Sequence, residues 1–112
     1  MEIRVQSIHF DADKKLLEFI KRKVEKLGQL YGRIIGADVY LRLERVGDEA
    51  NKITEIKVEI PGNDLFVKEQ FKTFEEATDN AVESLKRQIQ RHKEKMKVTP
   101  VPADTFTFET IE

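Results

Sequence analysis

Residues 53–71, ITEIKVEIPGNDLFVKEQF, decide the fold because they contain two alternating segments joined by a short turn. In the first segment apolar side chains alternate with charged ones, which is the period of a strand with one buried face. Its apolar members are Ile56, Val58 and Ile60. Pro61 fixes φ, and Gly62 or Asn63 tolerates a positive φ, so the chain can reverse here. Residues 65–71 alternate less regularly, and we interpret them as the second strand of an antiparallel pair.

Two further segments show the same period of two. Residues 2–8 and residues 38–46 place apolar side chains on one side and polar ones on the other. Each of them therefore predicts a half-buried strand. Their apolar positions are Ile3, Val5, Val39, Leu41 and Leu43. The polar residues 47–51, GDEAN, predict a turn before the next strand.

Two other segments have the period of an amphipathic helix. Asp13 is the predicted N-cap of a helix that ends near Leu27, with Gly28 as a left-handed residue just after its end. Thr73 and Glu76 have the spacing of a capping box, which predicts the start of a second long helix. The expected buried stripes are Leu16, Ile20, Val24 and Leu27 in the first helix, and Phe74, Ala77, Ala81, Val82, Leu85 and Ile89 in the second.

The resulting order, β-α-β-β-β-α, predicts an α+β fold with one four-stranded mixed sheet and two long helices packed on one face. The first two strands flank a helix and should be parallel neighbours, whereas the last three should form an antiparallel meander. At 112 residues the chain is expected to hold one domain, over residues 1–97. Residues 98–112 are expected to be a flexible acidic tail. We expect a monomer.

The composition excludes several classes of protein. The chain has no cysteine, which excludes disulfides and thiolate chemistry and indicates a reducing compartment. Its N-terminus lacks the pattern of a signal peptide, and no apolar run approaches the roughly 20 residues of a membrane span. We therefore expect a cytoplasmic protein with no membrane partner.

The sequence contains no recognisable catalytic or metal-binding motif. It has no phosphate-binding glycine loop, no nucleophile motif and no cluster of metal ligands, so we expect no enzyme activity, no small-molecule substrate and no cofactor. For His92 two interpretations stay open, a contact to phosphate or a base and a plain helix-end residue, whereas His9 is expected to be structural or solvated. An acidic ladder is compatible with a magnesium site, but carboxylates in the first turns of a helix are ordinary partners of its dipole. The ladder consists of Glu75, Glu76, Asp79 and Glu83.

Charge is segregated along the chain although the net charge is only −1. Residues 86–97 contain six basic residues and one acidic residue. The second helix, over residues 74–96, should be about 35 Å long, whereas strands of seven or eight residues span about 25 Å. About two turns should therefore project beyond the sheet, and they carry two rows of cations. One row is Arg87, Arg91 and Lys95, and the other is Lys86, Lys93 and Lys97.

The first helix carries further cations, namely Lys14, Lys15, Lys21, Arg22, Lys23 and Lys26. Side by side, the two helices would form one basic surface, which suits a phosphate backbone because each neutralised phosphate releases a counterion. Rows of lysine and arginine without a base-reading loop favour recognition of shape and backbone over base sequence. The alternative is a solvated helix end, since the helix dipole also favours cations there.

Two segments resemble the ribosome hibernation promoting factor family over about residues 1–97. They are KLGQLYGRI at residues 26–34 and LKRQIQRHKEKMK at residues 85–97. The matching positions are Lys23, Lys26, Arg33, Leu85, Arg87, Gln88, Ile89, Arg91, His92, Lys93, Lys95 and Lys97. The chain departs from the family at residues 73–75, where many members have an Asp-Met-Tyr-like segment, and at Ser84, where a lysine is common.

The resemblance implies a non-enzymatic protein that binds the small ribosomal subunit between head and platform. There it would occupy the path of mRNA and tRNA and block translation during starvation or stationary phase. The resemblance and the basic rows together predict contacts to ribosomal RNA from Lys23, Lys26, Arg33, Lys86, Arg87, Arg91, His92, Lys93, Lys95 and Lys97. Because fifteen residues follow Lys97, the likeness is to the short members of the family. The alternative function is a general RNA-binding or RNA-chaperone domain.

Overall fold

The computed structural model describes residues 1–44 and 51–98, with side chains as far as Lys95. Its elements follow the predicted order and confirm the α+β fold class. They are β1 (Glu2–Ser7), α1 (Lys14–Leu30), β2 (Gly36–Leu43), β3 (Lys52–Ile60), β4 (Asn63–Phe71) and α2 (Phe74–Val98). Two predicted features fall largely outside the described residues: the turn at 47–51, apart from Asn51, and the tail, apart from Val98 at the end of α2.

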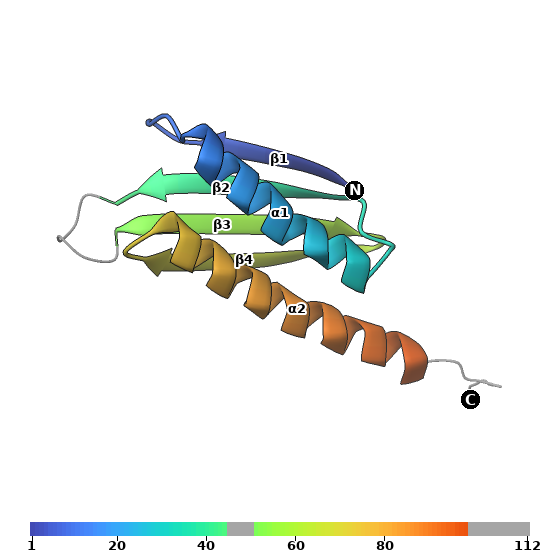
Figure 1. Cartoon of the computed structure of the whole chain (residues 1–112). Helices are drawn as coiled ribbons and strands as arrows, with labels where there is room; N and C mark the ends of the chain where they lie inside the picture. The colour runs from blue at the N-terminus through green and yellow to red at the C-terminus, as the bar shows by residue number, and fades with distance from the viewer. Residues whose placement is uncertain (45–50, 99–112) are drawn as a thin grey trace.

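The four strands form one mixed sheet in the order β1-β2-β3-β4. β1 and β2 are parallel, with Glu2 opposite Gly36, whereas β2, β3 and β4 are antiparallel neighbours. Both helices cover the same face of the sheet, α1 on the side of β1 and β2 and α2 on the side of β4 (Figure 1). The predicted topology is therefore confirmed, and residues 1–44 and 51–98 place no helix on the opposite face of the sheet.

The hydrophobic core lies between the sheet and the two helices. Its buried side chains are Ile20, Val24, Leu27, Phe74, Ala77, Ala81, Val82, Leu85 and Ile89 from the helices, and Val39, Leu41, Ile56, Val58, Ile60, Leu65 and Val67 from the strands. Leu16, Ile3 and Val5 are partly buried and pack against this core. The prediction was wrong for Leu43, which is 46% exposed. It is the last residue of β2 and pairs with Lys52 at the end of the sheet, beyond the core.

The turn between β3 and β4 consists of Pro61 and Gly62, between the paired residues Ile60 and Asn63. The sequence allowed a positive φ at Gly62 or Asn63. In the structure it is Gly62 that has the positive φ, at +79°. Proline followed by a glycine with positive φ is the pattern of a type II turn. The tight turn makes β4 begin at Asn63, two residues earlier than predicted.

Helix α1 is longer than predicted, and Gly28 does not end it. The helix continues to Leu30, and Tyr31 caps it in an extended conformation with φ −144°. Gly28 therefore lies inside the last turn, where a Cβ atom would be 3.3 Å from Cε of Met1. Two contacts explain the extension, because Tyr31 is buried in the core and its N–H donates to the carbonyl of Leu27 at 3.0 Å.

Both predicted helix starts are confirmed. The Asp13 carboxylate accepts a hydrogen bond from the N–H of Leu16 at 2.8 Å, and the Thr73 hydroxyl accepts one from the N–H of Glu76 at 3.1 Å. The Glu76 carboxylate also accepts a hydrogen bond from the Thr73 hydroxyl at 3.3 Å, so the two predicted capping residues bind each other. Within the described part of the chain, neither helix is long and apolar enough to cross a membrane.

Candidate nucleic-acid interface

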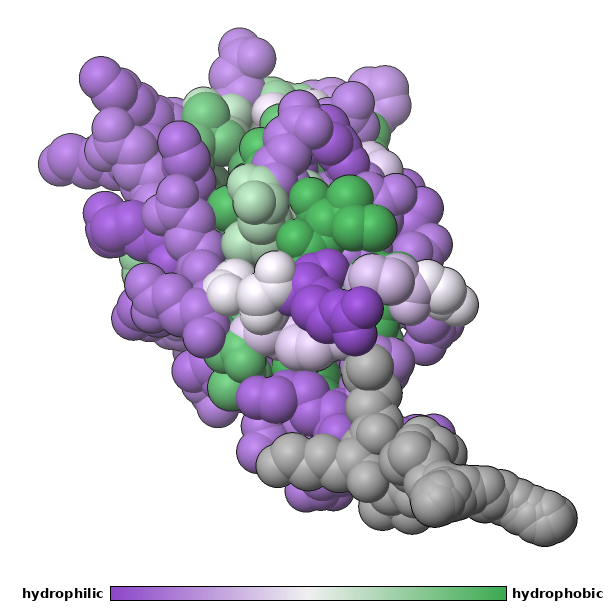
Figure 2. Space-filling view, turned by 90° about the vertical axis from the view of Figure 1, so that its right-hand side faces the viewer, coloured by the Kyte–Doolittle hydropathy of each residue, from purple (hydrophilic) through white to green (hydrophobic). Residues whose placement is uncertain are grey.

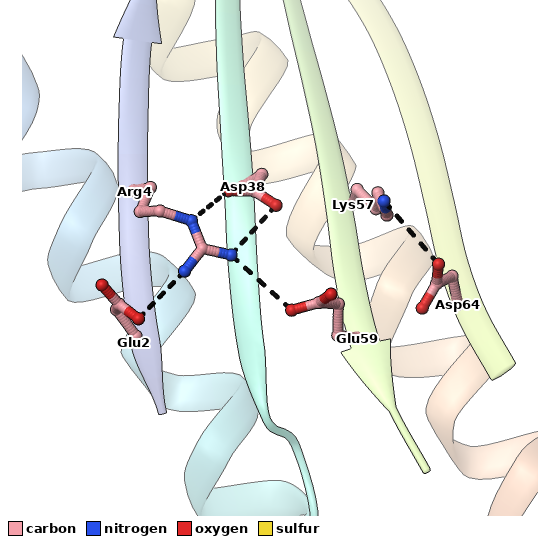
Figure 3. Close-up of polar contacts among 6 residues, drawn as sticks. All are labelled: Glu2, Arg4, Asp38, Lys57, Glu59 and Asp64. Carbon is pink, nitrogen blue, oxygen red and sulfur yellow. Dashed lines mark hydrogen bonds and ion pairs between the residues drawn. The ribbon is translucent and has the colours of Figure 1, made fainter. Parts of the chain in front are cut away.

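The face of the sheet opposite the helices, here called the open face, carries charges of both signs. Arg4 is the centre of one cluster (Figure 3). Its guanidinium contacts three carboxylates: Glu2 at 3.0 Å, Asp38 through two nitrogens, and Glu59 at 3.6 Å. The hydrogen bond from Arg4 holds the pKa of Asp38 below its ordinary value.

Two more ion pairs cross the open face. Lys57 lies 3.7 Å from Asp64, and Arg42 lies 2.9 Å from Glu55. Cations of the open face are thus largely paired with carboxylates of neighbouring strands. A surface neutralised in this way offers little attraction to a polyanion.

The cations of α2 lie along two different flanks of the helix. Gln88 donates to the carbonyl of Phe66 in β4 at 3.3 Å, so its flank faces β4. Lys93 donates to the carbonyl of Leu30 at 3.1 Å, so its flank faces α1. By helical periodicity Lys86 and Lys97 share the flank of Lys93, and we call these three residues the inner row. The outer row, on the flank away from α1, is Arg87, Arg91 and Lys95.

The inner row faces two of the predicted site residues in α1. Lys23 pairs with Asp79 of α2 at 3.1 Å, and its ammonium lies 5.5 Å from the centre of the Phe19 ring. Lys26 is three residues further along the same flank and is exposed. Arg33 is exposed in the connection that follows α1. The structure therefore gathers Lys23 and Lys26 of α1 and Lys86 and Lys93 of α2 around the junction of the two helices.

The cations differ in whether they already form an ion pair or hydrogen bond within the protein. Lys23, Lys86 and Lys93 are bound to Asp79, to Glu83 at 3.2 Å and to the carbonyl of Leu30, respectively. By contrast, the side chains of Lys26, Arg33, Arg87 and Arg91 are exposed and form no ion pair or hydrogen bond with any other described residue. Lys97 lies in α2, but its side chain is outside the described set.

The C-terminal turns of α2 continue beyond the ends of the strands, as predicted (Figure 1). They nevertheless touch the end of α1, which the sequence did not indicate. The ring of His92 packs edge-on against Tyr31, with ring centres 5.7 Å apart and an angle of 73° between the planes. The neighbouring residue, Lys93, donates a hydrogen bond to the carbonyl of Leu30. The pattern of the sequence gave no signal for either contact, because both join residues about sixty positions apart.

Figure 2 shows the end of the molecule from which α2 projects. Hydrophilic surface surrounds smaller hydrophobic areas on this end. Two of the exposed apolar side chains, Met1 and Ile35, belong to the segments that begin β1 and precede β2, and Ile35 is 60% exposed. This end of the molecule is therefore not uniformly polar.

The acidic ladder of α2 does not form a metal site in the described part of the chain. Asp79 and Glu83 pair with Lys23 and Lys86, and Glu75 and Glu76 lie in the first turn of α2. No group of three potential ligands that could hold a metal ion occurs among the described side chains. The ladder is better explained by helix-dipole and ion-pair partners.

Comparison with known proteins agrees with the fold and identifies the family. The model of the family described as "Sigma 54 modulation protein / S30EA ribosomal protein" matches residues 3–97. A ribosome hibernation promoting factor of Salmonella typhimurium is 27% identical over 97 residues, which cover 87% of this chain and 98% of that protein.

Two solved structures share the fold. A ribosomal subunit interface protein from Coxiella burnetii superimposes with a TM-score of 0.74 at 17% identity, over 83% of this chain and 98% of that one. The N-terminal domain of Protein Y from Thermus thermophilus superimposes with a TM-score of 0.70 at 25% identity, over 82% of this chain and 99% of that one. The resemblance found in the sequence is thereby confirmed, and the chain belongs to the Sigma 54 modulation protein / S30EA family of ribosome hibernation promoting factors.

Proposed function

We propose that this protein is a ribosome hibernation factor that binds the small ribosomal subunit, occludes the path of mRNA and tRNA, and inhibits translation in stationary phase or stress. It acts by binding in the cytoplasm, as a monomer, without catalysis or a cofactor. Membership in the family supports the ribosome as the partner. The small subunit and the occluded path rest on the resemblance of the basic segments.

The observation that carries the proposal is the unequal charge of the two faces. On the open face, Arg4, Arg42 and Lys57 are paired with carboxylates. On the helical side, Lys26, Arg33, Arg87 and Arg91 are exposed and not held by other described groups. Exposed cations that lack a counter-charge within the protein contribute most to the affinity for a phosphate backbone.

We assign the contacts with ribosomal RNA to the two rows of α2 and to the neighbouring cations of α1. The proposed residues are Lys23, Lys26, Arg33, Lys86, Arg87, Arg91, His92, Lys93, Lys95 and Lys97. Lysine and arginine in such rows bind phosphate groups, which favours recognition of the shape of folded RNA. Lys93 has three N–H donors and uses one for Leu30, so two remain for RNA.

Sedimentation through a gradient with purified ribosomal subunits tests the proposal. The protein should travel with the small subunit at low salt, and excess transfer RNA or other structured RNA should not displace it. A protein that remains at the top of the gradient would contradict the proposal. Equal competition by unrelated RNA would favour the general RNA-binding alternative.

A charge-reversed variant tests the assigned surface. R87E/R91E/K95E should lose co-sedimentation while keeping the circular dichroism spectrum and the unfolding temperature of the unchanged protein within a few degrees. Arg87 and Arg91 are exposed on the flank of α2 away from α1, and their side chains are not paired with any other described group, so we expect the fold to tolerate the change of charge. Unchanged binding by this variant would remove the outer row from the interface.

A further inference from the structure

The last turn of α1 is weakly stabilised by its own residues. It contains Gly28, which costs about 1 kcal/mol relative to alanine inside a helix. It has no basic residue to complement the negative end of the helix dipole. It also lacks a left-handed glycine cap, because Tyr31 follows in an extended conformation. The end of α1 therefore needs support from elsewhere in the molecule.

Helix α2 supplies that support through two adjacent residues. The Lys93 ammonium donates to the carbonyl of Leu30 at 3.1 Å in a part-buried contact. This carbonyl is one of the four at a helix C-terminus that have no partner inside the helix. The cation that α1 lacks thus comes from a residue 63 positions away. His92 packs its ring against Tyr31, which is 8% exposed and directly follows Leu30.

We propose that Lys93 is a positioning residue as well as a cation of the inner row. By holding Leu30, it fixes the end of α1 against α2 and sets where Arg33, three residues later, is presented relative to the rows of α2. A binding surface assembled from two helices gains affinity when its parts are held in place before the partner arrives. This inference rests on the proposed function for its effect on binding, whereas the contact itself can be tested on the free protein.

Hydrogen exchange followed by NMR tests the contact without any ribosome. In Lys93→Gln the amide protons of the last turn of α1 should exchange about fivefold faster, because a hydrogen bond from a charged group is lost. Lys93→Arg keeps a cationic donor and should restore most of the protection. Arg91→Gln is the matched control, since it removes one charge from the same helix on the flank away from α1. Unchanged exchange in Lys93→Gln would overturn the proposal.

A double-mutant cycle on ribosome affinity tests the positioning role. Arg33→Gln should weaken binding of the unchanged protein but have a smaller effect in the Lys93→Gln background, since Arg33 is then no longer held. In the Arg91→Gln background its effect should remain full. If Arg33→Gln and Lys93→Gln are additive, Lys93 is only an independent contact and the positioning role is wrong. If the unchanged protein binds no ribosome, the proposed function fails, while the exchange experiment still decides whether Lys93 holds α1.

Discussion

At the scale of single residues, Gly28 and Gly62 have opposite conformational requirements. Gly62 has φ +79° in the turn between β3 and β4, a conformation that a residue with a Cβ atom adopts only with strain. Gly28 lies in a helix with an ordinary φ, and the atom nearest to its position for a Cβ is Cε of Met1, at 3.3 Å. That atom is the end of a flexible side chain that is 45% exposed. A methyl group at Gly28 can therefore be accommodated.

We expect Gly28→Ala to raise the free energy of unfolding by about 0.5–1 kcal/mol, because alanine loses less backbone entropy in a helix. Gly62→Ala should lower it by about 1–2 kcal/mol, because the positive φ must be kept. Urea unfolding of both variants measures whether the free energy of unfolding rises or falls in each. A destabilised Gly28→Ala variant would show that Met1 is fixed in place.

The cluster around Arg4 predicts a pH dependence. The pKa of Asp38 is lowered in the folded state by the hydrogen bond from Arg4. Its contribution to stability is therefore complete above the unfolded pKa of about 3.9 and is lost as the pH falls through the lower folded pKa. The unchanged protein should be more stable than Asp38→Asn by a constant margin from about pH 7 to pH 5, and the margin should shrink below about pH 4.

Urea midpoints measured between neutral and acid pH test this expectation. Arg4→Gln is the matched variant, since it removes the guanidinium that lowers the pKa of Asp38. In the Arg4→Gln background, Asp38→Asn should cost much less at neutral pH. A margin that stays constant to pH 2 would mean that the pair does not stabilise the fold.

At the scale of elements, the sequence predicted well what depends on neighbours in the chain. The apolar stripes, the caps at Asp13 and Thr73 and the order of strands are local patterns, and the structure confirms them. The end of α1 was predicted wrongly, because the burial of Tyr31 and the contact to Lys93 outweigh the local tendency of Gly28 to end a helix. Both are long-range effects.

The candidate site shows the same difference between local patterns, which the sequence predicted, and long-range contacts, which it did not. Helical periodicity predicted the two rows of α2 from spacing alone. It could not predict that the inner row faces α1, because that depends on how the helices pack on the sheet. Nor could it predict which cations are already paired, such as Lys23 with Asp79, since these partners come from different helices.

The cap of α2 provides a test at this scale. The Thr73 hydroxyl satisfies the N–H of Glu76, one of the four at a helix N-terminus that lack an intrahelical acceptor. Thr73→Ala should lower the free energy of unfolding by about 1 kcal/mol, and Thr73→Ser should retain most of the stability because it keeps the oxygen. Chemical unfolding followed by circular dichroism distinguishes the two. Equal losses in both variants would assign the effect to the methyl group of threonine.

At the scale of the whole molecule, the fold separates two kinds of charged surface. The sheet joins oppositely charged residues from neighbouring strands, so its open face is largely neutral within itself. The helices present cations whose counter-charges are fewer and lie mainly in the first half of α2. A molecule with an overall charge of −1 can in this way approach a polyanion with one face only.

This separation predicts how salt affects binding to the ribosome. The logarithm of the affinity should fall linearly with the logarithm of the salt concentration, with a slope set by the number of phosphates that the protein neutralises. Removal of two phosphate contacts in Arg87→Gln/Arg91→Gln should reduce the magnitude of that slope by about 1.5. Removal of two cations from the open face in Arg42→Gln/Lys57→Gln should leave the slope unchanged, because both are already paired with carboxylates of the protein. Affinities measured at several salt concentrations decide which face binds, provided that each variant unfolds like the unchanged protein. An equal reduction of the slope in both variants would show that overall charge, rather than the helical surface, drives association.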